Sequence, residues 1–501
     1  MEKNLSPRSA KYSRPPVVAV LGHIDHGKSS LLDHIRQTNV VGDEAGGITQ
    51  HISSYEVTHQ AESGERVITF LDTPGHAAFS SVRSQGIRAA DIAVLIVSAE
   101  DGVKPQTIEA FKSIQEQSLP FVVAVNKIDK PNSDPERTKI SLAENGIYIE
   151  EYGGDAPMAA ISAKTGEGVS ELLDTIILLA DMQELTADPS EPATGIVIES
   201  EVDPKKGIRA TLIIKNGTLT KGMAVTSGTA VCPVRMMYNF RGQALSEASF
   251  SSPVDLVGWN KQPQVGSDFL TFSNKKEAEK HCREQETKHN TSAVKPSAPQ
   301  EETIPVIVKS DTVGCLEAIK KEIGKMVEQE KPVHLVAADT GPITENDIRN
   351  ATVTEKTAVL GFNVPIDPAA DRLREQHQIP VKTFSLIYEL TDWLAEYVEK
   401  HRVRHEVEQV IGNLSVLKTF SRSKNRNIIG GRVDSGRIEV GKQVKIIRGN
   451  TELGTGTIKE LQCQKVPAQS VSEENECGLM VQSSVEIAPG DTIQSYTITI
   501  E

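Results

Sequence analysis

The sequence predicts a multidomain α/β plus β protein: an α/β domain, a β-barrel, a small α/β domain, a long linker helix and a C-terminal β-barrel. Three observations support this fold class. The apolar run Val17–Leu21 leads into a glycine-containing loop and then a helical pattern, as in a strand–loop–helix unit. Residues 193–272 and 412–501 contain short strand-like runs separated by glycine turns, which is typical of small barrels. Residues 304–384 alternate strand-like and helical runs, which indicates a compact α/β unit.

Length and composition set the broad class. A chain of 501 residues has room for roughly three to five domains. No apolar stretch is long enough to span a bilayer, and the polar residues 1–14 are expected to be a flexible N-terminus rather than a secretory signal. A net charge of −14 argues against general nucleic-acid coating. The cysteines contain no CxxC pair, so we expect reduced thiols in the cytoplasm rather than disulfides or zinc. They are Cys232, Cys282, Cys315, Cys463 and Cys477.

The segment after the first apolar run predicts a phosphate-binding loop. It fits the pattern G-x-x-x-x-G-K-[ST], in which glycines let backbone amides approach phosphate oxygens. Lys28 can reach the β and γ phosphates, and the Ser29 hydroxyl can bind magnesium. The alternative is an ordinary glycine turn, but a helical pattern follows and would place the phosphates at a helix N-terminus. The predicted contacts are Gly22, His23, Ile24, Asp25, His26, Gly27, Lys28 and Ser29.

A second motif follows the predicted strand Val67–Leu71. Asp72 at the strand end can hold magnesium through water, and Gly75 can offer a backbone amide to the γ-phosphate. His76 is the candidate catalytic residue, which would orient the attacking water. A histidine in a loop is more often an ordinary polar residue, but its position beside this motif favours the catalytic role. The predicted nucleotide contacts are Asp72, Thr73, Pro74, Gly75 and His76.

Thr49 lies between these two motifs, in the segment Gly46–Gln50. In GTP-dependent switches a threonine at this point completes the magnesium shell while the γ-phosphate is present. The predicted metal ligands are therefore Ser29, Thr49 and Asp72.

Two further motifs predict the base. The apolar run Leu119–Val125 delivers Asp129 to the carboxyl end of a strand, where ligands bind in open α/β sheets. The Asp129 carboxylate can accept hydrogen bonds from guanine N1 and its exocyclic amine, which adenine cannot provide. A later strand would bring Ser162–Lys164 over the ring. The predicted base contacts are Asn126, Lys127, Ile128, Asp129, Ser162, Ala163 and Lys164. Together the motifs predict an enzyme that binds GTP or GDP with Mg²⁺ and hydrolyses GTP.

The remaining pattern sets the expected boundaries. The apolar residues between 390 and 398 recur at helical spacing, which indicates the long helix. We expect a nucleotide-binding domain at 15–182, a barrel at 190–280, a linker at 281–303, an α/β domain at 304–386, a linker helix at 387–410 and a barrel at 411–501.

Residues 17–180 resemble the G domain of translational GTPases, and Asp25 and His26 in the phosphate loop separate them from Ras-like proteins. The domain order resembles bacterial translation initiation factor two, with local matches at Gly361–Val364, Ile387–Leu390 and Glu476–Gly478. The resemblance implies ribosome-stimulated GTP hydrolysis. It also implies that the protein helps initiator tRNA bind the small ribosomal subunit and promotes joining of the large one. Further implied properties are a monovalent cation at Asp25, contact with other initiation factors, and a monomeric state.

The resemblance also implies that the final barrel grips the formyl-methionyl end of the tRNA. Residues matching part of that grip are Glu476, Cys477 and Gly478. Two departures put formyl selectivity in doubt. Gln462 and Cys463 replace a usual Lys-Arg pair, and Gly431 replaces a usual cysteine. No long extension precedes the G domain, so contacts that the family makes through one are expected to be absent.

Residues 411–448 contain nine Lys or Arg against Asp434 and Glu439, a local charge of +7. This charge favours an RNA backbone contact over a merely solvated face. The basic residues are Lys418, Arg422, Lys424, Arg426, Arg432, Arg437, Lys442, Lys445 and Arg448.

Two alternatives to an initiation factor remain open. The first is another ribosome-associated GTPase with changed tRNA selectivity. The second is a scaffold that binds GTP without hydrolysing it, which the presence of Lys28, Thr49 and His76 disfavours.

Overall fold

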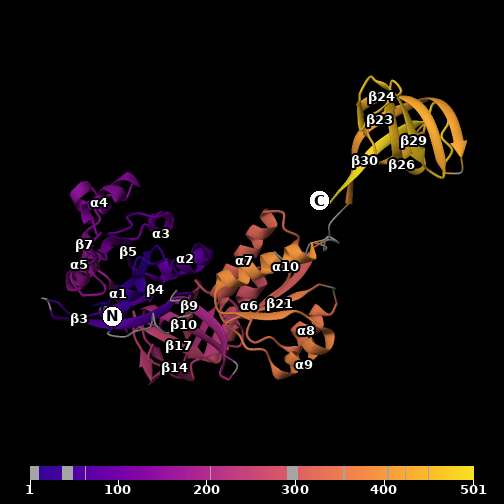
Figure 1. The fold of residues 1–501 in the computed structure, drawn as a ribbon. Helices are drawn as coiled ribbons and strands as arrows, with labels where there is room; N and C mark the ends of the chain where they lie inside the picture. Colours follow the sequence, from indigo (N-terminus) through magenta and orange to yellow (C-terminus); the bar gives the residue numbers. More distant parts are fainter. Residues whose placement is uncertain are drawn as a thin grey trace, which may run out of the picture. The chain divides into compact units, whose positions relative to one another are not determined.

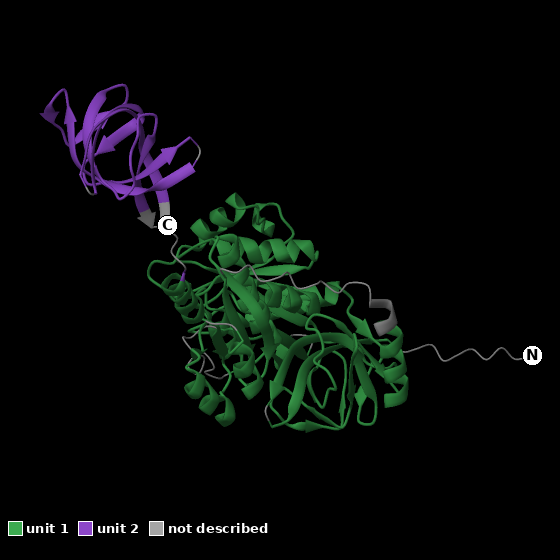
Figure 2. Cartoon of the chain, turned by 90° about the vertical axis from the view of Figure 1, so that its right-hand side faces the viewer, with its two compact units in different colours: residues 1–401 green, residues 402–501 purple. Residues whose placement is uncertain are grey.

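The chain forms two compact units, residues 1–401 and residues 402–501 (Figure 2). The first contains the predicted nucleotide-binding domain, a barrel-like β domain and a small α/β domain; the second is a β-barrel (Figure 1). The predicted fold class is therefore confirmed. No helix in the described part of the chain is long and apolar enough to cross a membrane. The computed structural model describes residues 11–36, 49–61, 64–203, 205–289, 303–353, 356–402, 406–423, 425–449 and 451–500.

A six-stranded sheet forms the centre of the first domain, in the order β3-β4-β2-β5-β6-β7. Only β3 is antiparallel to its neighbour. Every residue of β2 is buried, as expected for a parallel strand covered on both faces. The carboxyl ends of β2, β4 and β6 therefore meet at one edge and carry the predicted motifs there. The strands are β2 (Val17–Gly22), β3 (Ser53–Ala61), β4 (Gly64–Asp72), β5 (Ile92–Ser98), β6 (Phe121–Asn126) and β7 (Met158–Ala160).

Helices cover both faces of this sheet. One apolar cluster joins α1 and α5 to one set of strand side chains, and a second joins α2, α3 and α4 to the other set. The start of α4 shows how local sequence sets a helix end. The Asp134 side chain accepts a hydrogen bond from Arg137 N, and Pro135 occupies the first turn. The helices are α1 (Lys28–Arg36), α2 (Ser80–Ala89), α3 (Pro105–Glu116), α4 (Pro135–Glu144) and α5 (Val169–Met182), with 3-10 turns η2 (Ala77–Phe79) and η3 (Glu150–Tyr152).

The N-terminal segment corrects one expectation. Residues 1–10 lie outside the described residues, but β1 (Tyr12–Ser13) pairs with β8 (Thr186–Ala187). Arg14 then forms an ion pair with Asp91 at 2.6 Å. A flexible N-terminus as far as residue 14 is therefore wrong for residues 11–14, because long-range pairing fixes them.

The barrel-like domain consists of an eight-stranded sheet and the pair β11-β16 around one apolar core. Helix α6 (Lys275–His289) packs on it through Ala278 and Cys282. The linker expected from residue 281 therefore begins too early, since the helix continues with Cys282 buried against the barrel. Residues 290–302 lie outside the described part. The strands are β9 (Thr194–Asp203), β10 (Gly207–Asn216), β11 (Leu219–Thr220), β12 (Ala224–Ser227), β13 (Ala230–Pro233), β14 (Met236–Tyr238), β15 (Ala244–Leu245), β16 (Glu247–Ala248), β17 (Pro253–Val257) and β18 (Asp268–Phe272).

The small α/β domain has four parallel strands in the order β20-β19-β21-β22. Residues of α7 and α10 share an apolar core with β19, β21 and the G-domain turn η2. The elements are β19 (Ile304–Ser310), α7 (Val313–Glu328), β20 (Val333–Thr340), α8 (Glu345–Ala351), β21 (Ala358–Phe362), α9 (Pro368–His377), β22 (Val381–Phe384) and α10 (Ile387–His401).

The predicted linker helix is shorter than expected. Its buried apolar positions end at Val398, and α10 ends at His401 instead of residue 410. Residues from Glu406 onward belong to a strand that pairs with the end of the chain, Glu406 opposite Ile500. This long-range ladder overrides the local helical reading of the segment.

The second unit is a closed barrel. Its ladder runs β23-β30-β25-β26-β29-β24, and β24 pairs back onto β23. Closure leaves no free edge in this ring and encloses a continuous apolar core. The strands are β23 (Glu406–Ser423), β24 (Arg426–Glu439), β25 (Gln443–Arg448), β26 (Thr451–Cys463), β27 (Val466–Pro467), β28 (Ser470–Ser472), β29 (Glu476–Gln482) and β30 (Thr492–Ile500).

We predict that residues 402–501 fold as a separate unit whose stability depends on this core. Ile493 is 0% exposed and Ile498 is 43% exposed on the same strand. In the isolated segment, Ile493→Ala should lower the free energy of unfolding by about 2–5 kcal/mol, whereas Ile498→Ala should cost less than about 1 kcal/mol. Urea unfolding followed by circular dichroism measures both, and equal losses would contradict the assigned register.

Candidate nucleotide-binding site

The predicted phosphate loop, Thr49 and the Asp72–His76 motif meet at one cavity of about 210 Å³. The loop needs its glycines, because a Cβ on Gly27 would lie 2.3 Å from Asn126 Nδ2 at a φ of +88°. A Cβ on Gly75 would similarly lie 2.5 Å from Lys28 Nζ. The cavity is lined by Ile24, Asp25, Gly27, Lys28, Ser29, Ser30, Thr49, Gly75, His76 and Lys127.

Lys28 is folded back onto its own loop. Its ammonium donates hydrogen bonds to Gly22 O at 3.1 Å and His23 O at 2.7 Å. Burial lowers the pKa of Lys28 to about 8, and the nearby Asp72 carboxylate acts against that shift. Phosphate oxygens could replace these carbonyl acceptors and stabilise the charged ammonium.

Two of the predicted magnesium ligands already lie together. Ser29 Oγ is 2.8 Å from Thr49 Oγ1. Adjacent ligands of an octahedral magnesium with its usual bond lengths are separated by roughly 3 Å, so the two hydroxyls fit neighbouring positions. Asp72 is buried at the end of β4, and the next residue is fixed by a hydrogen bond from Thr73 Oγ1 to Val20 O at 2.8 Å.

His76 reaches the same cavity as Lys28 but is held by two other contacts. Ala78 N donates to its Nδ1 at 3.0 Å, and Tyr388 of α10 meets its ring edge-on with centroids 4.4 Å apart. Burial lowers the pKa of His76, so a neutral imidazole is favoured. Arg83, which the sequence did not single out, donates to Gly75 O at 3.0 Å and steadies the motif.

The His26 side chain lies behind the phosphate loop rather than in the cavity wall. It is 1% exposed, does not line the cavity, and accepts a hydrogen bond from Ser98 N at 3.3 Å. Burial lowers the pKa of His26 to about 3, so this side chain is a neutral support behind the loop. His23 also lies outside the cavity lining, and Gln106 Oε1 accepts a hydrogen bond from Ile24 N at 3.0 Å.

The predicted base-recognition residues are joined by hydrogen bonds. Asn126 donates to His26 O and accepts from Ala163 N, both at 2.9 Å, so it links the phosphate loop to the later motif. Ser162 Oγ donates to Asp129 Oδ1 at 2.7 Å, and this hydrogen bond lowers the pKa of Asp129. An ionised carboxylate can thus face the base. Lys164 is exposed beside this group.

The residues that follow Thr49 form contacts that sequence reasoning missed. Gln50 donates to Ser385 O at 2.8 Å and accepts from Ile387 N at 3.3 Å, at the start of α10. Ile52 N donates to Glu199 Oε2 of β9 at 3.3 Å. In the sequence, the only signal for these contacts was that Gln50 and Ile52 closely follow Thr49, the predicted switch threonine.

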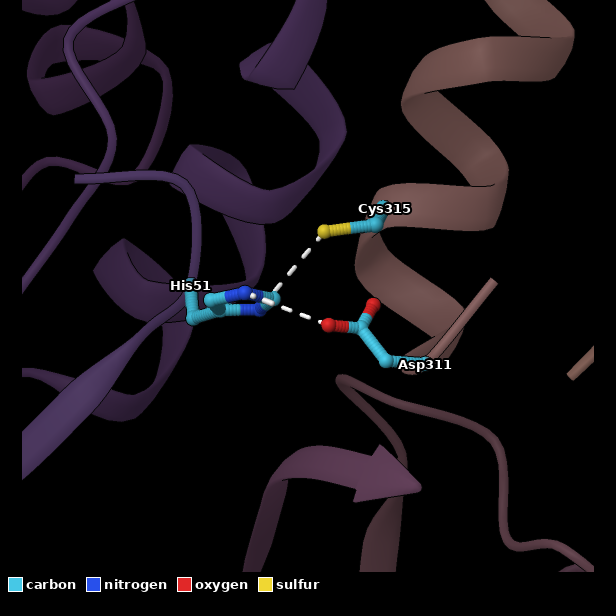
Figure 3. Close-up of side chains that lie close together, drawn as sticks. All are labelled: His51, Asp311 and Cys315. Atoms are coloured by element: carbon cyan, nitrogen blue, oxygen red, sulfur yellow. Dashed lines mark hydrogen bonds and ion pairs between the residues drawn. The ribbon is translucent and has the colours of Figure 1, made fainter. Parts of the chain in front are cut away.

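His51 lies between a carboxylate and a thiol of the small α/β domain (Figure 3). Its Nε2 is 3.4 Å from Asp311 Oδ2, and its Nδ1 is 3.6 Å from Cys315 Sγ. The three side chains are of metal-binding types. Each partner uses a different ring nitrogen, however, so the imidazole is placed as a bridge rather than as one ligand beside two others.

A larger cavity, of about 580 Å³, opens in the C-terminal barrel. All three residues predicted to contact tRNA lie in its wall, together with the departure positions Gly431 and Gln462. Its lining is Leu417, Lys418, Phe420, Ile428, Ile429, Gly430, Gly431, Glu460, Gln462, Gln464, Lys465, Glu476, Cys477, Gly478, Leu479 and Met480.

Gly431 is required by its neighbours in this barrel. A Cβ at this position would lie 2.4 Å from Leu414 Cδ2 and 2.5 Å from Ser415 O. A cysteine would therefore need a shift of the backbone or of the buried Leu414.

Only part of the basic surface predicted at residues 411–448 is available to contact RNA. Arg422, Arg437, Lys445 and Arg448 form ion pairs with Glu486, Glu439, Glu408 and Asp491. Three of these acids lie outside residues 411–448. The local charge of +7 therefore overstated the positive charge that is available to bind RNA. Lys418, Arg426 and Arg432 are exposed and have no ion pair among the described residues.

Comparison with known families agrees with this geometry. The elongation factor Tu GTP binding domain family matches residues 14–182, elongation factor G domain 2 matches residues 192–272, and translation-initiation factor 2 matches residues 276–395. The fold and these matches define a translational GTPase, an enzyme that hydrolyses GTP.

Comparison with individual proteins identifies the family within the translational GTPases. The chain is 37% identical to translation initiation factor IF-2 of Rubrobacter xylanophilus over 497 residues, covering 97% of this chain and 71% of that one. It is 39% identical to the factor of Aquifex aeolicus, covering 97% of this chain and 62% of that one. A crystal structure of GDP-bound aIF5B from Aeropyrum pernix is 28% identical at a TM-score of 0.47, covering 97% and 92% of the two chains. The chain belongs to the translation initiation factor IF-2 family.

The Glu199 contact predicts a pH dependence of stability. Burial raises the pKa of Glu199 from 4.5 to about 8, and Asp311 adds to the shift. Between these values the folded state keeps a proton that the unfolded state releases, so this contribution to stability falls as pH rises from 4.5 to 8. Glu199→Gln should therefore raise the melting midpoint at about pH 8 and leave it nearly unchanged at about pH 5.

Thermal unfolding at both pH values tests this, with exposed Glu247→Gln as the matched control. An equal effect of Glu199→Gln at the two pH values would show that the carboxyl does not titrate in this range.

Proposed function

We propose that the protein is an initiation GTPase that promotes binding of formyl-methionyl initiator tRNA to the small ribosomal subunit and then joining of the large one. The observation that carries the tRNA part is the C-terminal cavity. Leu417, Phe420 and Met480 give it apolar surface suited to a methionyl side chain, and Glu476–Gly478 and Gln462 add polar groups. Exposed Lys418 at the same wall can contact the RNA backbone.

In the proposed nucleotide site, the loop Gly22–Ser29 binds the phosphates, and Lys28 exchanges its two carbonyl acceptors for phosphate oxygens. Ser29 and Thr49 hold magnesium directly, and Asp72 does so through water. When bound, the magnesium neutralises phosphate charge. Asp129 selects guanine, supported by Asn126 and closed over by the loop 162–164.

Hydrolysis depends on His76 in this proposal. Its neutral imidazole is suited to orienting water rather than to acting as a strong acid. In the free protein Nδ1 is engaged by Ala78 N and the ring by Tyr388, so intrinsic hydrolysis should be slow. The large ribosomal subunit then moves the ring into its active position.

Several finer properties belong to the same proposal. The protein acts in the cytoplasm as a monomer, binds both ribosomal subunits and contacts other initiation factors. Asp25 helps to hold a monovalent cation, which its position in the cavity wall permits.

The alternative function is that of another ribosome-associated GTPase with changed tRNA selectivity. The observation that favours it is the altered cavity wall, with Gly431 and Gln462 in place of the residues that the family usually has. Both proposals share the nucleotide site and differ in the tRNA that the barrel accepts.

We expect His76→Ala to leave GTP affinity within about threefold and to lower ribosome-stimulated hydrolysis by at least about a hundredfold, because general acid–base and positioning groups contribute effects of this size. Phosphate release with and without ribosomes measures the loss, and fluorescent GTP measures binding. The matched control is His59→Ala, since His59 lies on β3 and pairs with Asp174 at 2.9 Å. Stimulated turnover that survives in His76→Ala would refute the assignment.

We expect the full chain to bind formylated initiator tRNA more tightly than the unformylated form and than an elongator tRNA. Phe420→Ala should weaken binding of the formylated tRNA by about tenfold, or 1.4 kcal/mol, because it removes apolar surface from the cavity. The control is Ile498→Ala, another exposed apolar side chain of the barrel that does not line the cavity. Filter binding gives the affinities, and the absence of any preference would favour the alternative function.

A further inference from the structure

Two cysteines face each other across neighbouring strands of the C-terminal barrel. Cys463 near the end of β26 is the direct partner of Cys477 on β29 in an antiparallel ladder. Directly opposed residues in such a ladder have Cα atoms about 4.5–5.5 Å apart, which lies inside the range of about 4.4–6.8 Å found in disulfides.

The hydrogen-bond pattern identifies the kind of pair. β26 turns into β27 through two residues, with Cys463 opposite Val466. On this side Ala468 N donates to Leu461 O at 2.9 Å, so Leu461 and Cys463, two residues apart, direct their backbone groups toward β27. Cys463 and Cys477 are therefore a non-hydrogen-bonded pair, the type in which opposed side chains approach most closely.

Both thiols lie on the face of the sheet that is directed toward the barrel core. Cys477 belongs to the apolar core of the barrel and is 5% exposed, and Cys463 packs against the same core while remaining half-buried. Cys463 Sγ lies 3.7 Å from Glu476 O, beside Cys477. A reagent can therefore reach Cys463 first, and Cys477 is the neighbour that can resolve the product.

We propose that Cys463 and Cys477 form a reversible oxidative modification site, an intramolecular disulfide that includes Cys477 of the C-terminal cavity wall, made by exchange with a small-molecule disulfide. The Cys463 thiolate attacks one sulfur of the reagent, forms a mixed disulfide and releases one thiol, which takes up the proton that Cys463 lost. The Cys477 thiolate then attacks Cys463 Sγ and releases the second thiol with its proton. Two protein thiols are oxidised and one reagent disulfide is reduced to two thiols.

The bond has a direct consequence for the cavity. Cys477 lies in its wall, and Gln462, Gln464 and Lys465 come from the end of β26 and its turn. A covalent link between β26 and β29 fixes the distance between the parts of the cavity wall that these two strands form. It also directs Cys477 Sγ toward β26. Oxidation should therefore weaken binding of the occupant severalfold; this part rests on the proposed tRNA function.

The test uses the full chain equilibrated with mixtures of reduced and oxidised glutathione, followed by alkylation and trypsin without reductant. Lys459 and Lys465 flank Cys463, and no Lys or Arg follows Lys465, so the site gives two defined peptides, 460–465 and 466–501. We expect these peptides to be joined in the oxidised protein. Cys232, Cys282 and Cys315 are buried and should stay reduced as internal controls.

Two variants separate the steps. Cys477→Ser should retain glutathione on Cys463, because the resolving thiol is gone, whereas Cys463→Ser should acquire almost none because Cys477 is buried. Unlinked peptides in the oxidised wild-type protein would overturn the proposal, as would stable glutathione on its Cys463. The same samples are assayed for initiator tRNA binding. A linked protein with unchanged affinity would overturn the effect on the cavity, while failure of the reduced protein to bind would count against the tRNA function alone.

Discussion

The first unit depends on four consecutive residues, Thr49–Ile52, that contact each of its parts. Thr49 lies against Ser29 of the phosphate loop, and Gln50 is hydrogen-bonded to Ser385 O before α10. His51 faces Asp311, and the amide of Ile52 donates to Glu199 of the barrel-like domain. Successive residues of this segment therefore contact the phosphate loop, the small α/β domain and the barrel-like domain. If Thr49 binds magnesium as proposed, its release on loss of the γ-phosphate would displace Gln50 at the start of α10.

Asp91 forms a second contact between parts of the first unit. Burial alone would raise the pKa of Asp91, but Arg14 and Lys215 lower it, so the carboxylate stays ionised between two cations. Arg14 belongs to the N-terminal segment and Lys215 to β10 of the barrel-like domain. Removing one partner of a buried ion pair leaves an uncompensated charge, so loss of Arg14 or Lys215 should destabilise the folded unit. Glu199 differs, since the described residues give it no ion pair and its pKa is raised to about 8. Asp91 is thus held by two ion pairs, whereas Glu199 accepts a hydrogen bond from Ile52 N.

The sequence predicted what local chemistry determines. Gly27 and Gly75 were recognisable because their motifs require bare backbone, and a Cβ at either position would displace Asn126 or Lys28. Local patterns could not predict contacts between distant segments. The end of α10 at His401 depends on a ladder with β30, and the pairing of Arg448 depends on Asp491. The roles of Gln50 and Tyr388 required knowledge of how α10 packs on the G domain. The direction of the His26 side chain could not be predicted, because a motif gives the position of a residue but not the direction of its side chain.

The two cavities differ in how their walls are built. In the nucleotide cavity, backbone groups and glycines define the shape, so a substitution such as a Cβ on Gly75 strikes Lys28 directly. In the C-terminal cavity, side chains on a closed barrel form most of the wall. Gly431, Cys477 and Cys463 occupy one row across β24, β29 and β26. Since Leu414 fills the space beside Gly431, Cys463 is the partner within reach of Cys477, and a side chain larger than glycine at position 431 would require a shift of Leu414 or of the backbone.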